Sequence, residues 1–317
     1  MTGPADRGAP LARQIDRATR TGRPGPSPTE RRSAFAFRFM AAYFRRYLVR
    51  HMNAWRIARS GEFRLPAGAG PIVVYANHPS WWDAAIVVVA AAEFLPAHAS
   101  FAPLDEAMLG KYGVFGRIGA FGVDIESPRG AAAFLAAATD ILSRPDRALW
   151  ITAQGRFADV RERPLGLKAG VARLPEIAPD ALFVPMAIEY AFWEERGAEA
   201  FVAFGPPLTG RELLALPRPA RRDRLEADLT ATLDRLSRDV QARDPNRFRV
   251  LLQGRAGIGG VYDGWRRLAA SWRGRPFDPS HSTRPGTVGR ASSPPYAGER
   301  QPAEGRQGEG PWRAGSG

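Results

Sequence analysis

Cysteine is absent from the sequence, and lysine nearly so. Without cysteine the chain can form no disulfide, zinc–thiolate site or iron–sulfur cluster, and it has no cysteine nucleophile. Lys111 and Lys168 are the only lysines, so arginine supplies almost all of the cationic charge. The formal net charge of +13 favours anionic partners, such as phospholipid surfaces or phosphorylated substrates. Part of that charge reflects a bias toward arginine and alanine, and no nucleic-acid-binding motif accompanies it, so nucleic acid is not an expected partner.

Long apolar runs are missing as well. The longest, residues 84–95, contains Glu93 and is shorter than the about 20 residues that a bilayer-spanning helix needs. The N-terminus has no apolar segment of the kind found in secretory signals. These absences predict a cytoplasmic chain without a membrane-spanning segment.

The middle of the chain alternates between β-branched apolar runs and stretches of helical periodicity. Strands are predicted at 71–77, 119–125, 148–154, 181–190 and 199–205. Helices are predicted at 81–94, 128–143, 166–176 and 220–243, the last with an apolar stripe of Leu225, Leu229, Leu233, Leu236 and Val240. This alternation is typical of an α/β fold, so we expect a twisted, mostly parallel sheet flanked by helices.

The two ends differ from this middle. Residues 1–31 and 274–317 are rich in proline, glycine and arginine and lack periodic apolar residues, which predicts disordered termini, the first of them basic. Between them we expect an amphipathic helix at 33–59 and a main domain at 60–273, with its motifs within 71–205.

The segment 33–59 combines aromatic and basic residues. One broad face of the predicted helix carries Phe39, Met40, Tyr43, Phe44, Tyr47, Leu48 and Trp55, and the other carries Arg38, Arg45, Arg56 and Arg59. This pattern is typical of a helix lying in the interface of an anionic membrane. It fits equally a helix that packs its aromatic face on the protein core, and the sequence leaves both interpretations open. On the first, deleting 33–59 would release the protein from membranes without unfolding residues 71–205.

The stretch "VVYANHPSWWDAAIVV" places His78 at the carboxyl end of a predicted strand, just before a predicted helix. Ligands bind beyond the carboxyl ends of strands in open α/β sheets. Asp83 can close a capping box that begins at Ser80, or it can orient His78 as a general base, and both roles are compatible. No GxSxG turn or cysteine supplies a protein nucleophile, so the hydroxyl that loses a proton to His78 would belong to the substrate.

Four segments together resemble the glycerolipid acyltransferase superfamily, which includes the bacterial lysophosphatidic acid acyltransferases. Residues 77–83, NHPSWWD, resemble its NHx4D motif. Residues 116–130 (GRIGAFGVDIESPRG), 149–174 and 182–190 (LFVPMAIEY) resemble its second, third and fourth blocks in the same order. The resemblance covers residues 71–205 and implies a glycerol-3-phosphate acyltransferase-like fold.

The resemblance also implies an O-acyltransferase of phospholipid biosynthesis. Such enzymes take a fatty acyl group from acyl-CoA or acyl-carrier protein, need no metal or bound cofactor, and acylate a hydroxyl of a lysophospholipid or glycerol-phosphate-like lipid. His78 would be the general base and Asp83 its partner. The substrate-binding residues within the blocks would be Asn77, Arg129, Gln154, Gly155, Arg156, Arg161, Arg163, Lys168, Gly170 and Pro185. Together with the basic helix, this predicts a cytoplasmic protein bound peripherally to the inner face of the cell membrane.

The third block departs from the family pattern. It reads AQGRF at 153–157 where the family has Pro-Glu-Gly-Thr-Arg, so an amide at Gln154 replaces a carboxylate. In the second block Ile125 stands where the family has arginine, and Arg129 is the candidate replacement. The lost carboxylate favours a more anionic acceptor, or one whose hydroxyls need a hydrogen-bond donor as well as an acceptor. Two alternatives therefore stay open: acylation of a glycolipid or glycosylated isoprenoid, and a weakly active lipid-binding protein of the same fold.

Overall fold

Most strands form where the apolar runs predict them. The computed structural model describes residues 26–66 and 68–254. The five expected strands are β2 (Ile72–Ala76), β4 (Ala120–Val123), β5 (Arg147–Thr152), β6 (Leu182–Ala191) and β7 (Glu199–Phe204). The strands that the sequence did not predict are β1 (Ala54–Ala58), β3 (Ala99–Asp105), β8 (Leu208–Thr209) and β9 (Phe248–Gln253).

These strands form one mixed sheet in the order β4-β3-β5-β2-β6-β7-β1-β9, with β8 beside β6. Neighbours from β4 to β6 run parallel, as do β7 and β1, whereas β6 with β7 and β1 with β9 are antiparallel. The predicted α/β fold with a mostly parallel sheet flanked by helices is therefore confirmed. β2 lies between β5 and β6, so the turn that follows it opens at the middle of the parallel part.

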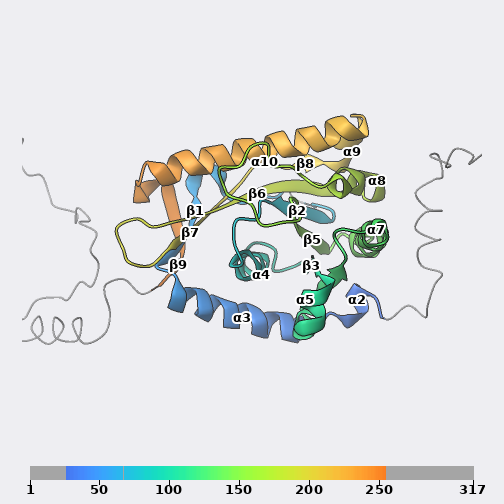
Figure 1. Cartoon of the computed structure of the whole chain (residues 1–317), viewed down its shortest axis with the longest axis horizontal. Coiled ribbons are helices and arrows are strands. Elements are labelled where there is room, and N and C mark those ends of the chain that lie inside the picture. The colour runs from blue at the N-terminus through green and yellow to red at the C-terminus, as the bar shows by residue number, and fades with distance from the viewer. Residues whose placement is uncertain (1–25, 67, 255–317) are drawn as a thin grey trace, which may run out of the picture. The chain divides into compact units, whose positions relative to one another are not determined.

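Helices cover both faces of this sheet. α3 (Ala34–His51) and α4 (Asp83–Phe94) lie on one face, and α7 (Pro128–Leu142) and α10 (Arg218–Gln241) lie on the other (Figure 1). The shorter helices are α2 (Pro28–Arg31), α5 (Glu106–Lys111), α6 (Val114–Arg117), α8 (Leu174–Ile177) and α9 (Gly210–Leu214), with 3-10 turns η1 (Arg59–Gly61), η2 (Ala169–Arg173) and η3 (Pro245–Arg247).

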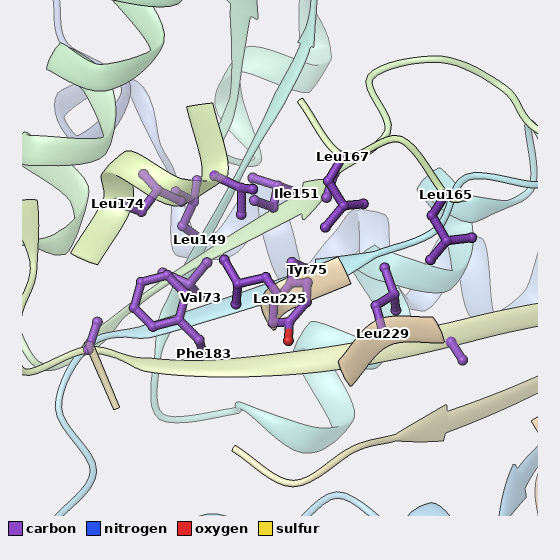
Figure 2. Packing of buried hydrophobic residues seen from close by; sticks show 14 of the residues in the cluster. Val73, Tyr75, Leu149, Ile151, Leu165, Leu167, Leu174, Phe183, Leu225 and Leu229 are labelled. Carbon is purple, nitrogen blue, oxygen red and sulfur yellow. The ribbon is translucent and has the colours of Figure 1, made fainter. Parts of the chain in front are cut away.

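The predicted leucine stripe of α10 packs on the sheet. Its members are all buried, and Figure 2 shows Leu225 and Leu229 among side chains of β2, β5 and β6, including Tyr75, Ile151 and Phe183. Alternate residues of β2 face the opposite cluster, which α3 and α4 complete. Because both faces of the central strands are covered, their sequences are continuously apolar, as expected for parallel strands.

The prediction of a single helix over 33–59 is wrong beyond His51. α3 ends at His51, and Ala54–Ala58 form strand β1, which pairs with β7 and β9. All five residues of β1 are buried, because neighbouring strands and both core layers enclose it. Trp55 and Ile57, an aromatic and a β-branched residue, suit an extended chain at least as well as a helix.

Two further expectations need correction. Residues 166–176 were expected to form one helix, but Gly166 adopts φ +70° and only the turn η2 followed by α8 forms. Residues 1–31 were expected to be disordered, yet Pro28–Arg31 form α2, capped by Ser27. Residues 1–25, the last part of the predicted main domain (255–273) and all of 274–317 lie outside the described residues.

Candidate functional site

The turn after β2 is anchored by the side chain of Asn77. Its amide donates to the carbonyl of Ile188 and accepts from the amide N–H of the same residue, both at 2.8 Å. Asn77 is 2% exposed, so both ends of its amide are committed to β6. This residue, expected to bind substrate, instead joins two neighbouring strands and so fixes the position of the next residue, His78.

His78 and Asp83 meet as the motif predicts. Nδ1 of His78 lies 2.6 Å from Oδ2 of Asp83. The carboxylate is 1% exposed, whereas the imidazole is 22% exposed. A carboxylate on Nδ1 fixes the tautomer that leaves Nε2 able to accept a proton. No described residue is hydrogen-bonded to Nε2, so the site presents a positioned base without a protein nucleophile on it.

Tyr190, near the end of β6, completes this arrangement. Its hydroxyl donates to Oδ1 of Asp83 at 2.7 Å. Burial, together with the charge and the hydrogen bond of Asp83, raises the pKa of Tyr190 well above the usual value for a phenol. The hydroxyl therefore stays protonated near neutral pH and remains a donor. His78, Asp83 and Tyr190 are called the trio below.

Asp83 also supports the turn before its helix. The predicted capping box from Ser80 to Asp83 does not form, because α4 begins only at Asp83 and its N-cap is Trp82, without a side-chain cap bond. Instead, Oδ2 of Asp83 accepts from the amide N–H of Ser80 at 3.1 Å, and Oγ of Ser80 accepts from the N–H of Trp82 at 3.3 Å. The carboxylate therefore both supports the turn before the helix and orients the imidazole.

Gln154 supports the same turn from β5. Its Oε1 accepts from the amide N–H of His78 at 2.9 Å, and its Nε2 donates to the carbonyl of Leu165 at 2.9 Å. The side chain is 2% exposed. An ionised carboxylate at this position could accept the first bond but could not donate the second. The amide thus holds two loops together. Because it is buried, it does not line the surface of a substrate pocket.

Phe157 covers one side of the imidazole. Its ring centroid lies 4.3 Å from that of His78, although Phe157 itself is 58% exposed. The loop that carries it is tied to the site by a bond from the N–H of Ala158 to the carbonyl of His78 at 3.0 Å. Phe157 therefore presents an apolar surface next to the base. Nothing in the motif pattern predicts this position of Phe157, which depends on the path of the loop.

The four basic residues of the third block that were expected to bind substrate are each matched to a carboxylate. Arg156 pairs with Glu162, Arg161 pairs with Asp159 through two bonds of 2.8 and 2.9 Å, and Arg163 pairs with Asp234. Lys168 lies 3.7 Å from Glu126. The hydrogen bond to Arg156 lowers the pKa of Glu162, so this pair is ionised near neutral pH. These side chains do not form a preassembled phosphate pocket.

The remaining residues that were expected to bind substrate lie in different parts of the fold. Arg129 is exposed in the first turn of α7, where no described carboxylate pairs with it. Gly155 has φ +63° and its missing Cβ would lie 3.0 Å from Cγ of Lys168, so a glycine suits this turn. Gly170 lies in η2, and Pro185 is buried within β6 beside Tyr75. Pro185 therefore belongs to the sheet core.

No protein-family model matches the chain, and no curated protein matches it either. The chemistry must therefore be judged from the residues of the site.

Within residues 26–66 and 68–254, no group of histidine, aspartate and glutamate side chains is arranged to hold a metal ion. The trio can accept a proton at Nε2 of His78 and stabilise the resulting imidazolium through the buried carboxylate of Asp83.

Proposed function

We propose that the protein is an O-acyltransferase that moves an acyl group from acyl-CoA or acyl-carrier protein to a hydroxyl of a lipid acceptor. The observation that carries this proposal is the trio at the carboxyl end of β2, in which Nδ1 of His78 and both carboxylate oxygens of Asp83 are held by hydrogen bonds. No described hydroxyl is bonded to His78, so the nucleophile comes from the substrate.

The reaction follows from this geometry. Nε2 of His78 takes the proton of the acceptor hydroxyl while that oxygen attacks the thioester carbonyl. The tetrahedral intermediate collapses, the carbon–sulfur bond breaks, and the imidazolium returns the proton to the thiolate. Asp83 stabilises the imidazolium between these steps, as the carboxylate does in a serine–histidine–aspartate triad. A thioester is an activated donor, so a single positioned base suits this chemistry.

The order of the four blocks over residues 71–205 also supports the proposal, which includes a glycerol-3-phosphate acyltransferase-like arrangement of the sheet. The amide of Gln154 makes two structural hydrogen bonds, one of which an ionised carboxylate could not donate. Its presence is therefore no sign that the protein has lost turnover. This favours an active enzyme over the lipid-binding alternative.

The charged residues near the site are compatible with two classes of acceptor. Arg129, without a described carboxylate partner, and the exposed Lys168 favour a phosphate-bearing acceptor, such as a lysophospholipid. The pairing of Arg156, Arg161 and Arg163 with carboxylates favours an uncharged sugar headgroup, as in a glycolipid or glycosylated isoprenoid. A phosphate would have to displace these carboxylates, whereas sugar hydroxyls could bond to the pairs as they stand.

An acyl-transfer assay tests both the activity and the acceptor. The full chain is given acyl-CoA or acyl-carrier protein with lysophosphatidic acid, a lysophospholipid without a free phosphate monoester, or a glycolipid. We expect His78→Ala to reduce transfer by about 10²–10⁴-fold. His98→Ala is the matched control, because His98 precedes β3 and so lies at the amino ends of the parallel strands, whereas His78 lies at their carboxyl ends. Equal activity of the two variants and the wild type would overturn the proposal.

A further inference from the structure

Helix α3 has two apolar faces, and only one of them packs on the protein. Phe37, Ala41, Phe44 and Leu48 are buried against α4 and the sheet. Phe35, Phe39 and Tyr43 lie on the opposite side and are 74%, 65% and 51% exposed. The spacing of four residues puts these three rings in one row along the helix. They are called the exposed row below.

The same side of α3 is strongly basic. Arg46 and Arg50 continue the exposed row toward the end of the helix, and both are exposed. Arg38 and Arg45 flank it, and of the two only Arg45 is paired with a carboxylate in the described part of the chain, Glu93 at 3.4 Å. The sequence of α3 contains no aspartate or glutamate. An exposed aromatic row on a helix without acidic residues is unsuited to water and is complementary to an anionic, partly apolar surface.

A chain of aromatic rings leads from this row to the candidate active site. Tyr43 stacks on Tyr47 at 6.0 Å, Tyr47 lies 5.4 Å from Trp82, and Trp82 lies 6.0 Å from Trp81. Trp81 is 58% exposed and comes three residues after His78. The exposed row and the turn that carries the base are therefore parts of one continuous aromatic surface.

We propose that this surface docks on an anionic lipid bilayer, with Phe35 and Phe39 in the interfacial region, Arg46 and Arg50 on lipid phosphates, and Trp81 at the same interface beside His78. Within the described residues no helix is long and apolar enough to span a membrane, so the contact is with the bilayer surface. The proposal deepens the proposed function, on which it rests for the claim that the lipid at this surface is a substrate.

Aromatic and arginine side chains suit this occupant specifically. Aromatic rings favour the headgroup region of a bilayer, and each arginine near an anionic leaflet contributes to binding. The long axis of α3 would then lie parallel to the membrane, as in interfacial amphipathic helices. A lipid hydroxyl at headgroup depth would reach His78 without leaving the interface.

Vesicle sedimentation with the full chain tests the docking. Neutral phosphatidylcholine vesicles are compared with vesicles that also contain phosphatidylglycerol. We expect binding to the anionic vesicles only, weakened about tenfold or more in Phe35→Ser/Phe39→Ser. Arg46→Gln/Arg50→Gln should weaken it about fivefold per arginine and reduce its salt dependence. Thermal melting of each variant checks that it is folded.

Met108→Ser/Val250→Ser is the matched control, since both residues are 38% exposed apolar side chains that lie outside α3, in α5 and β9. The proposal fails if this control weakens vesicle binding as much as the phenylalanine pair, or if the wild type binds no anionic vesicles. It also fails if the phenylalanine variant keeps its vesicle affinity but changes from an oligomer to a monomer, because the row would then be an interface between copies.

Activity separates this proposal from the proposed function. We expect Phe35→Ser/Phe39→Ser to keep its turnover of a short-chain, water-soluble acceptor and to lose turnover of the acceptor in vesicles. His78→Ala should keep its vesicle affinity. If no substrate is turned over while vesicle binding responds as expected, the docking surface stands and the proposed function fails.

Discussion

The carboxylate of Asp83 accepts three hydrogen bonds in the candidate site. It accepts from His78 and the backbone of Ser80 through Oδ2, and from Tyr190 through Oδ1. A buried carboxylate is costly unless it is hydrogen-bonded, and these three partners meet that requirement. The orientation of His78 and the turn before α4 therefore depend on the same group, and a substitution here must be judged on both activity and stability.

Asp83→Asn should separate these two roles. Asparagine can still accept a bond from Ser80, so we expect a loss of about 1 kcal/mol in the free energy of unfolding, the usual size of one hydrogen bond. It cannot stabilise an imidazolium as a carboxylate does, so activity should fall far more than stability. Urea denaturation and the acyl-transfer assay measure the two effects. Full turnover in this variant would leave Asp83 with a structural role only.

Tyr190→Phe tests the third member of the trio. The variant leaves Oδ1 of Asp83 without a donor, and a hydrogen bond to a charged group contributes about 1.5–3 kcal/mol. We expect a loss of this size in the free energy of unfolding and a fall in kcat with little change in KM, because the substrate contacts remain. Tyr112→Phe, on an exposed residue, is the control. A change in KM alone would place Tyr190 in substrate binding instead of positioning.

Gln154→Glu should be destabilising at neutral pH. The ionised carboxylate would be buried and could not donate to the carbonyl of Leu165, which costs about 1–3 kcal/mol. Burial raises the pKa of such a carboxyl group, so the folded variant binds a proton more tightly than the unfolded one. Its stability relative to the wild type should therefore rise as the pH falls from 8 to 5.

Denaturation at several pH values checks this expectation. Gln241→Glu, on an exposed residue of α10, should show no such dependence. If Gln154→Glu is as stable as the wild type at pH 8, the two bonds of the amide are not needed to hold the turn.

At the scale of elements, α3 shows how one helix can serve two surroundings. Its buried row joins the core that α4 and the sheet form, whereas the side chains of its exposed row are 51–74% exposed. The sequence pattern of 33–59 had suggested a choice between core packing and membrane contact. The structure assigns aromatic residues to both sides, so packing on the protein and exposure to the surroundings occur together.

Single substitutions distinguish the two rows. Phe44→Ala should lower the free energy of unfolding by about 3–5 kcal/mol, because it leaves a cavity in the core. Phe39→Ala should change it by no more than about 0.5 kcal/mol, because Phe39 is 65% exposed. Thermal and urea denaturation measure both. Equal effects would mean that the exposed row is packed in the protein.

At the scale of the whole molecule, β1 ties the N-terminal part of the chain into the sheet. It lies between β7 and β9, and its Arg56 forms a buried ion pair with Glu199 of β7. The guanidinium of Arg56 also lies 5.0 Å from the ring centroid of Trp193. The helix and the strand at 33–59 are therefore an integral part of the folded domain.

Deleting residues 33–59 should accordingly unfold the protein, contrary to what the sequence pattern suggested. The deletion removes an interior strand and leaves Glu199 buried without its cationic partner, a loss of about 3–5 kcal/mol by itself. Circular dichroism during heating should show no cooperative transition. A truncated chain that melts as sharply as the full one would show that residues 71–205 fold without β1.

The features that depend on neighbours along the chain could be predicted from the sequence. The run before His78 gave a strand, the leucines of α10 gave a buried stripe, and the spacing of His78 and Asp83 brought the two side chains together across one turn. Periodicity and turn residues carry this information because they act within a few positions of the chain.

The distant residues that complete the site could not be predicted in this way, because the folding of the chain brings them together. Tyr190 reaches Asp83 across 107 positions, and Gln154 reaches the backbone of His78 across 76. Trp55 lies in a strand instead of a helix because β7 and β9 take up the backbone bonds of its segment. Local propensities for a short apolar segment are small, so packing and backbone pairing with remote strands decide such cases.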